Sequence, residues 1–159
     1  MVFDSVAFKN VISTGLVLDA KGNKMSKHLG NVKNPFDMIE RYGADAVRFY
    51  MMTNSSPWDN LKFDEEGVDE VRRKFFGTLY NTYSFFALYA NVDDFQPTGC
   101  FDKTKLKDAP EIDRWIISKL HSLIKGVEDD LNNFDPTRAG RLIDTFVNDD
   151  LSNWYVRLN

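Results

Sequence analysis

Four basic side chains lie close together in the stretch LDAKGNKMSKHLGN, residues 18–31. They are Lys21, Lys24, Lys27 and His28, and one glycine lies within the group and another just after it. Lysine ammonium groups are compact, mobile charges that suit phosphate oxygens, and glycine lets a backbone approach such a ligand closely. These residue types therefore fit a loop that wraps around a polyanion.

A second interpretation of the same stretch needs no ligand. Gly22-Asn23 suits the turn of a β-hairpin, and lysines are common in exposed turns. A hairpin, however, requires nothing beyond its return strand, whereas residues 25–31 prolong the irregular segment towards Pro35. A long loop of this composition favours a functional role over a minimal turn.

The amino-acid composition indicates which class of protein contains this loop. The 159 residues are 43% hydrophobic and 28% charged, which predicts a soluble globular protein. No apolar run is long enough to cross a bilayer, and the first residues do not resemble a secretory signal, so we expect a cytoplasmic protein. The single Cys100 is expected to be incidental, and no metal site is expected. With a net charge of −4, contact with nucleic acid requires a local basic patch.

The elements that must position the lysine loop begin with a segment of strand character, residues 7–25. VISTGLVLD is rich in β-branched residues, and Gly15 is expected to mark a bulge. After the loop, Asn34 as cap and Pro35 in the first turn predict a helix that ends at Gly43. A second short helix is predicted for ADAVRFYMMT from about Asp45, and residues 54–63 interrupt the pattern.

Three longer helices are predicted after Asp64, because apolar residues recur there at spacings of three and four. The second runs between Pro110 and Asn133, and Asp135 caps the third. Residues 93–110 are expected to form a surface loop. The fold class is therefore predicted to be mainly α: an antiparallel helical bundle, preceded by a small β-hairpin and loop segment. Because a lone hairpin is marginal and the last pattern ends at Leu158, we expect a piece of a larger protein.

Several segments in this order carry a resemblance to a known family. NKMSKHLGN, NPFDMIERYGADAVRFYMM, DRWIISKL and DLSNWYVR resemble the branched-aliphatic subgroup of class I aminoacyl-tRNA synthetases over nearly the whole chain. SSPWDNLKFDEEGVDEVRRKFFGTLYNTY is most similar to the members specific for isoleucine, while those for valine and leucine share the general pattern. The resemblance assigns residues 1–56 to the end of the catalytic domain and 57–159 to a truncated anticodon-binding bundle.

The resemblance also implies roles for the lysine loop. Lys27 and its partner Lys24 are the expected catalytic residues, and with Met25 and Ser26 they are expected to contact ATP. The whole protein would use ATP with Mg²⁺, isoleucine and tRNA(Ile). It is not expected to bind a membrane. The upstream histidine signature and the amino-acid pocket are not in this chain, so the fragment is expected to be inactive and without a tightly bound cofactor. It is also expected to be monomeric. His28 replaces the usual serine and is expected to be an exposed spacer.

Contacts with tRNA are expected from the helical part. Arg138, Arg141 and Arg157, with Lys119 and Lys125, are candidates for a basic strip along phosphates. The aromatic residues Trp115, Trp154 and Tyr155 lie on apolar faces, which favours core positions over base stacking.

Two further expectations concern the rest of the surface. Arg72, Arg73 and Lys74 are expected to form a solvated face of salt bridges with Asp69 and Glu70. A different class of protein also stays open: a helical interaction module whose lysine loop binds a phosphate-rich partner without catalysis.

Overall fold

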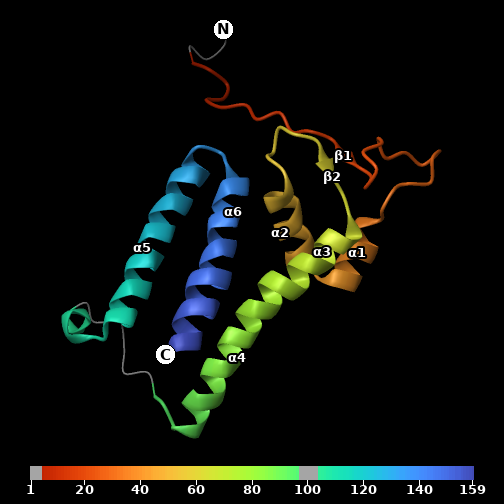
Figure 1. Cartoon of the computed structure of the whole chain (residues 1–159). Helices are drawn as coiled ribbons and strands as arrows, with labels where there is room; N and C mark the ends of the chain where they lie inside the picture. The colour runs from red at the N-terminus through yellow and green to blue at the C-terminus, as the bar shows by residue number, and fades with distance from the viewer. Residues whose placement is uncertain (1–4, 97–103) are drawn as a thin grey trace.

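Helices make up most of the chain in the computed structural model, which describes residues 5–96 and 104–159 (Figure 1). The predicted mainly α class is confirmed. The amino-terminal helices are α1 (Pro35–Tyr42) and α2 (Ala44–Asn54). A long continuous helix follows, made of α3 (Glu65–Val71), a π-helical turn η1 (Arg72–Phe76) and α4 (Gly77–Val92). After the 3₁₀ turn η2 (Lys105–Asp108) come α5 (Glu111–Asn132), α6 (Pro136–Thr145) and the π-helical η3 (Phe146–Val156). Cys100 lies outside the described residues.

The predicted helix caps are confirmed. Asn34 Oδ1 accepts the Phe36 N–H at 3.1 Å, and Pro35 lies in the first turn of α1. Gly43 adopts φ +86°, a region that favours glycine, and thereby separates α1 from α2. Asp135 Oδ1 accepts the Arg138 N–H at 2.9 Å at the start of α6. Each cap satisfies backbone groups that the helix itself leaves unpaired.

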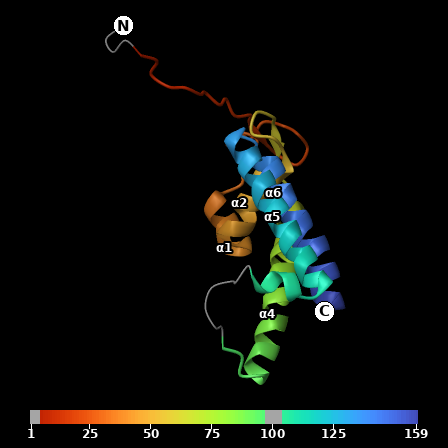
Figure 2. The same cartoon turned by 90° about the vertical axis from the view of Figure 1, so that its left-hand side faces the viewer.

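The extended strand predicted for residues 7–25 is wrong. The strand β1 spans only Val17–Leu18, and it pairs in parallel with β2, Leu61–Lys62, from beyond α2. The hairpin is reduced to one antiparallel bridge between Leu18 and Lys24. Residues 5–14 run away from the helices as an irregular, largely exposed segment (Figure 2). Within the described part of the chain no strand lies beside these ten residues, so their β-branched side chains have no sheet to join.

Gly15 does not mark a bulge; it allows two backbone segments to approach closely. Its N–H donates to Pro57 O at 2.9 Å. A Cβ at this position would lie 2.1 Å from Asp59 O, which leaves no room for any side chain. The segment that leads into the lysine loop is thereby held against the segment that follows α2.

The principal core joins α1, α2, β2 and α3. It is built from Met38, Ala46, Val47, Tyr50, Leu61, Phe63 and Val68. The Tyr50 hydroxyl donates to Lys62 O at 3.0 Å and accepts the Asp64 N–H at 3.1 Å, so it holds β2 next to the start of α3. Burial raises the pKa of Tyr50 above its usual value of about 10, which keeps the hydroxyl protonated as a donor.

The π-helical turn η1 brings two consecutive phenylalanines to one face. Phe75 stacks on Phe49 of α2 with ring centroids 4.2 Å apart, and Phe76 meets the same ring edge-on at 5.9 Å. An α-helix separates neighbouring side chains by about 100°, whereas a π turn adds a residue and shifts the helical phase. The long helix therefore contacts α2 through both rings.

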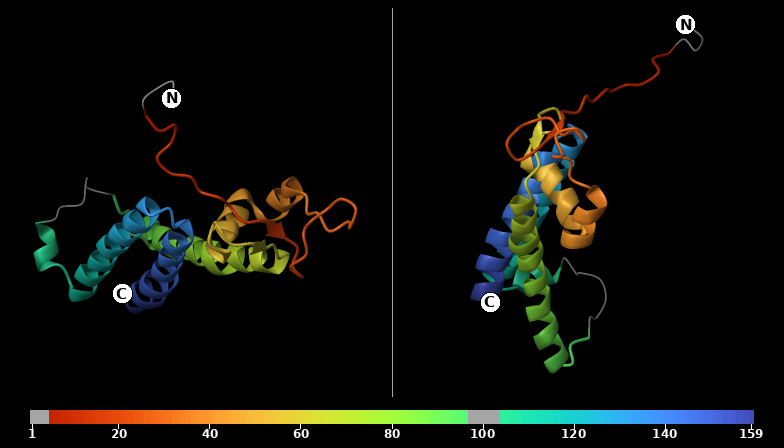
Figure 3. Two further views of the ribbon diagram at one scale, coloured as in Figure 1. Left: turned by 90° about the horizontal axis from the view of Figure 1, so that it is seen from above. Right: turned by 90° about the vertical axis from the view of Figure 1, so that its right-hand side faces the viewer.

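The helical bundle has α6 and η3 in the middle, with antiparallel α5 on one side and α4 on the other (Figures 1 and 3). The predicted bundle is present, but it does not bury the apolar stripe of α4. No residue of α4 is buried, because α4 extends past the ends of the neighbouring helices and α5 lies on the far side of η3. Its exposed large apolar residues are Leu79, Tyr80, Tyr83, Phe85, Phe86, Leu88, Tyr89 and Val92.

Candidate functional site: the lysine loop and its anchors

The lysine loop, residues 24–31, leaves its two lysines free to act on a ligand. Lys24 and Lys27 are exposed, and neither forms an ion pair within residues 5–96 and 104–159. Between them Met25 is partly buried and packs against the principal core, while Ser26 is half-buried. The backbone is therefore attached at Met25, and the charged groups project into solvent.

The neck of the loop is closed by one side chain, Asn31. Its Nδ2 donates to Asp19 Oδ2 at 3.0 Å and to Lys24 O at 3.3 Å. Its Oδ1 accepts the Ser26 N–H at 2.9 Å. Asp19 also accepts the Asn23 N–H at 2.7 Å. The hydrogen bond from Asn31 is the main cause that lowers the pKa of Asp19 below its usual value, so this carboxylate stays ionised.

The tip of the loop is made of short-range turns. Ser26 Oγ accepts the Leu29 N–H at 3.2 Å, and the Gly30 N–H donates to Lys27 O at 3.3 Å. Gly30 adopts φ +64°, which L side chains rarely do. His28 is exposed at the tip, as the sequence predicted for a spacer.

The outgoing arm of the loop is tied to the long helix through Glu65. Lys33 Nζ lies 2.6 Å from Glu65 Oε1, Arg41 Nη1 lies 3.2 Å from Oε2, and the Tyr42 hydroxyl donates to Oε2 at 3.3 Å. The bond from Lys33 lowers the pKa of Glu65 and raises the pKa of Lys33. Sequence reasoning assigned no role to Asp19, Asn31 or Glu65. Asn31 lies inside the motif, but nothing in the sequence distinguishes Glu65 from other acidic residues at helix starts.

The three arginines proposed for tRNA are in different environments. Arg141 donates from Nε to Thr53 O at 2.9 Å and from Nη2 to Asn54 O at 3.2 Å, so its guanidinium caps α2. Arg138 Nε lies 3.5 Å from Asp130 Oδ1. Arg157 is exposed and lies 16 positions after Arg141, beyond the π-helical η3.

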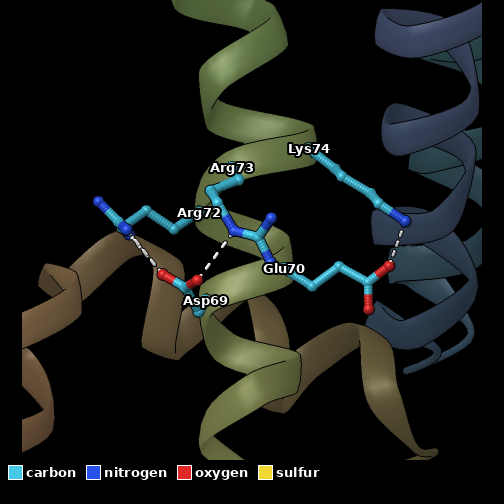
Figure 4. A network of polar contacts seen from close by, with 5 residues as sticks. All are labelled: Asp69, Glu70, Arg72, Arg73 and Lys74. Carbon is cyan, nitrogen blue, oxygen red and sulfur yellow. Dashed lines mark hydrogen bonds and ion pairs between the residues drawn. The ribbon is translucent and has the colours of Figure 1, made fainter.

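The solvated charged face predicted at the start of the long helix is confirmed (Figure 4). Asp69 accepts from Arg72 Nη2 at 2.7 Å and from Arg73 Nε at 2.8 Å. Glu70 pairs with Lys74. These cations are therefore engaged with carboxylates on their own helix.

The aromatic residues expected in the core are only partly covered. Trp154 is 59% exposed, so its predicted core position is wrong. Its ring is tilted against Trp115, with centroids 6.5 Å apart, and Trp115 is half-buried. The Tyr155 hydroxyl donates to Asp113 Oδ1 at 2.8 Å, which ties η3 to the start of α5.

Two family models match parts of the chain. The model described as tRNA synthetases class I (I, L, M and V) matches residues 1–64, and the anticodon-binding domain of tRNA ligase matches residues 113–159. The lysine loop lies within the first match, and α5, α6 and η3 lie in or overlap the second. The chain belongs to the class I aminoacyl-tRNA synthetases.

Within that family the chain is similar to isoleucine–tRNA ligases from several bacteria. Those of Bacteroides fragilis and Porphyromonas gingivalis are 66% and 62% identical over 159 residues, and that of Clostridium tetani is 48% identical over 158. The matches cover 100%, 100% and 99% of this chain, which itself spans only 14%, 14% and 15% of the relatives.

A solved structure supports the fold. The LeuRS of Agrobacterium radiobacter K84, in a ternary complex with tRNA and LeuAMS, matches with a TM-score of 0.62 at 23% identity. The match covers 90% of this chain and 18% of that one. Across the part of the chain that the structure describes, no helix is long and apolar enough to span a membrane.

Proposed function

We propose that this chain is the part of an isoleucine–tRNA ligase that supplies the lysine loop for amino-acid activation and begins the helical tRNA-binding domain. The whole protein activates isoleucine with ATP and transfers it to tRNA(Ile). The observation that carries the proposal is the loop itself. Lys24 and Lys27 are exposed and form no ion pair with any residue that the structure describes, on a backbone that Asn31 closes at the neck and that Met25 attaches to the core.

The chemistry of activation explains why lysines are needed there. The isoleucine carboxylate attacks the α-phosphate of ATP, the bond to pyrophosphate breaks, and negative charge has to be stabilised on the phosphate oxygens. A Lys27 ammonium that meets these oxygens in the transition state stabilises them more than in the ground state, which raises the rate. Lys24 supports that charge, and Met25 and Ser26 form the backbone on the ATP side.

In the whole protein, Mg²⁺ would accompany the ATP phosphates. Among residues 5–96 and 104–159, no three or more His, Cys, Asp or Glu side chains are grouped so that they could hold a metal ion. We also propose that the catalytic part ends near residue 56 and the helical part spans 57–159, with Arg138, Arg141 and Arg157 near tRNA. A monomeric chain in the cytoplasm fits these roles.

The test is a graft. Residues 1–159 replace the matching segment of the Bacteroides fragilis ligase, which is 66% identical over this length. Isoleucine-dependent exchange of pyrophosphate into ATP is then measured for the graft and for its Lys27→Ala variant. Losing a charge contact used in the transition state costs about 3 kcal/mol, or roughly a hundredfold in rate, with little change in isoleucine binding. An active graft with an unchanged rate in Lys27→Ala would exclude the proposed role.

A further inference from the structure

We propose that Asn31 is a positioning residue for the lysine loop, a clasp whose carboxamide joins the two ends of the loop and fixes the direction in which Lys24 and Lys27 are presented. This inference rests on the proposed function. It concerns a residue that does not itself carry the charge for catalysis.

The clasp spans the loop because its partners lie on both arms and inside it. Asp19 precedes the turn by which the chain enters the loop, and Asn31 is the last residue of the loop, 12 positions later. The same carboxamide reaches Lys24 O at 3.3 Å and the Ser26 N–H at 2.9 Å. One side chain therefore links the incoming arm, the first lysine and the residue before the second lysine.

A carboxamide suits this position because it both donates and accepts. Asp19 and Lys24 O offer only acceptors, and the Ser26 N–H offers only a donor. An alanine would leave all three groups without this partner. An aspartate would keep the bond from Ser26 but would face the Asp19 carboxylate, and two like charges at hydrogen-bond distance repel each other.

Few other contacts define the loop conformation. The bonds inside the tip, from Leu29 to Ser26 and from Gly30 to Lys27, are local turns that move with the tip as a unit. Lys24 bridges to Leu18, and Met25 packs on the core. Lys33 pairs with Glu65, so the loop is held on either side of its tip. Without the clasp, no side chain joins the two arms across the neck, and the arc from Ser26 to Gly30 can change direction between these attachments. A catalytic group displaced by about 1 Å loses on the order of a hundredfold in rate, so the direction of Lys27 matters.

The experiment uses the graft described above and exchanges the two partners of the clasp. Asn31→Asp should lower the activation rate by about tenfold or more, with little change in the KM for isoleucine, because the lysines are misdirected while the amino-acid site lies elsewhere. Asp19→Asn combined with Asn31→Asp restores a donor opposite a carboxylate and should recover most of the rate. Asn23→Asp is the matched control, since Asn23 also contacts Asp19, at 3.3 Å, but does not join the arms.

A second readout needs no catalysis. In the 159-residue chain, a lysine-specific protease should cleave after Lys24 and Lys27 faster in Asn31→Asp than in the unsubstituted chain. In the double variant, cleavage should be slower than in Asn31→Asp. Circular dichroism checks that the helices persist, so that loop opening is separated from unfolding.

The outcomes separate the two proposals. If Lys27→Ala leaves the activation rate unchanged, the proposed function fails, and the protease readout alone then judges the clasp. If Lys27→Ala is slow but Asn31→Asp matches the parent, the clasp is wrong and the function stands. The clasp is also wrong if Asn23→Asp loses as much activity as Asn31→Asp, or if the double variant is no better than the single one.

Discussion

At the scale of single residues, polar side chains hold the irregular segments where no regular backbone pairing is present. Glu65 is the clearest case, because it gathers Lys33, Arg41 and Tyr42 from two other segments around one carboxylate. Exposed ion pairs are worth only about 0–1 kcal/mol each, so this cluster contributes little to global stability. Its effect is local: it fixes the arm that leaves the lysine loop against the start of α3.

The first prediction concerns the pH dependence of that cluster. The pKa of Glu65 is lowered in the folded protein, so its stabilisation is present above the usual value of about 4.5 and is lost as pH falls through the lower folded value. The raised pKa of Lys33 keeps its ammonium charged throughout this range. Glu65→Gln should therefore cost up to about 1 kcal/mol in urea unfolding at pH 7 and progressively less as the pH is lowered below 4.5. A cost that does not change with pH would contradict the ionic origin.

At the scale of elements, α6 completes the end of α2. The last carbonyls of a helix have no partner within it. Here Thr53 O and Asn54 O accept from Arg141, while Thr137 Oγ1 lies 2.7 Å from Met52 O and 2.9 Å from Ser55 O. The carboxyl end of α2 is therefore capped by side chains more than 80 positions away in sequence.

The second prediction follows from this cap. Arg141→Ala removes two charge-assisted bonds to backbone carbonyls and should lower the free energy of unfolding by about 1–2 kcal/mol. Arg138→Ala is the matched control, since Arg138 is on the same helix and its side chain lies 3.5 Å from Asp130. Urea unfolding measures the free energy of unfolding of both variants. Equal losses would mean that the cap on α2 stabilises the protein no more than the contact of Arg138 does.

A third prediction uses two glycines of the long helix. A Cβ on Gly67 would lie 2.6 Å from Tyr50 Cε2, whereas one on Gly77 would meet only Arg72 O at 3.7 Å. Gly77→Ala should stabilise the protein by up to about 1 kcal/mol, as alanine does in a helix interior. Gly67→Ala should destabilise it, because the buried Tyr50 ring cannot move without breaking its bonds to Lys62 and Asp64. Thermal unfolding measures the melting temperature of both variants. Shifts in the same direction for Gly67→Ala and Gly77→Ala would contradict this packing.

What the sequence could predict at this scale follows from how local each signal is. Asn34, Gly43 and Asp135 act on backbone groups within a few residues, so the helix boundaries were predictable. The pairing of β1 with β2 joins segments 44 positions apart, and the π turn at Phe75 shifts the helical phase, so neither leaves a local pattern. The lysine loop was recognisable from its motif, but the partners of Asn31 and Glu65 depend on tertiary folding.

At the scale of the whole molecule, the spacing of apolar residues predicted an apolar stripe on the long helix. It did not predict how far along the helix other elements bury that stripe. Val68 and Phe75 are buried against the principal core, whereas Tyr83 and Phe86 on the same stripe are 65% and 57% exposed. The difference arises from arrangement: α2 and β2 cover the first part, whereas the second part packs mainly against η3. Spacing in a sequence tells which residues share a face, and tertiary contacts decide whether that face is covered.

The fourth prediction concerns the 159-residue chain by itself. It should show no isoleucine-dependent exchange of pyrophosphate into ATP, because the lysine loop supplies charge to a transition state whose amino-acid site and histidine signature are not among these residues. The graft in the Bacteroides fragilis ligase serves as the positive control. Exchange by the purified chain, abolished by Lys27→Ala, would overturn this division of roles.

The last prediction concerns tRNA binding by the same chain. Its 24 acidic residues outnumber its 20 lysines and arginines, and Arg72, Arg73, Lys74 and Lys119 are paired with carboxylates. Affinity should therefore stay in the non-specific range of about 10⁻⁴ to 10⁻⁶ M and fall steeply with salt. Arg157 is exposed, so Arg157→Ala should reduce the slope of log K against log salt by about 1, while Lys74→Ala leaves it unchanged. Fluorescence anisotropy with two different tRNAs measures both quantities, and tight binding that discriminates between them would show that this helical surface reads tRNA on its own.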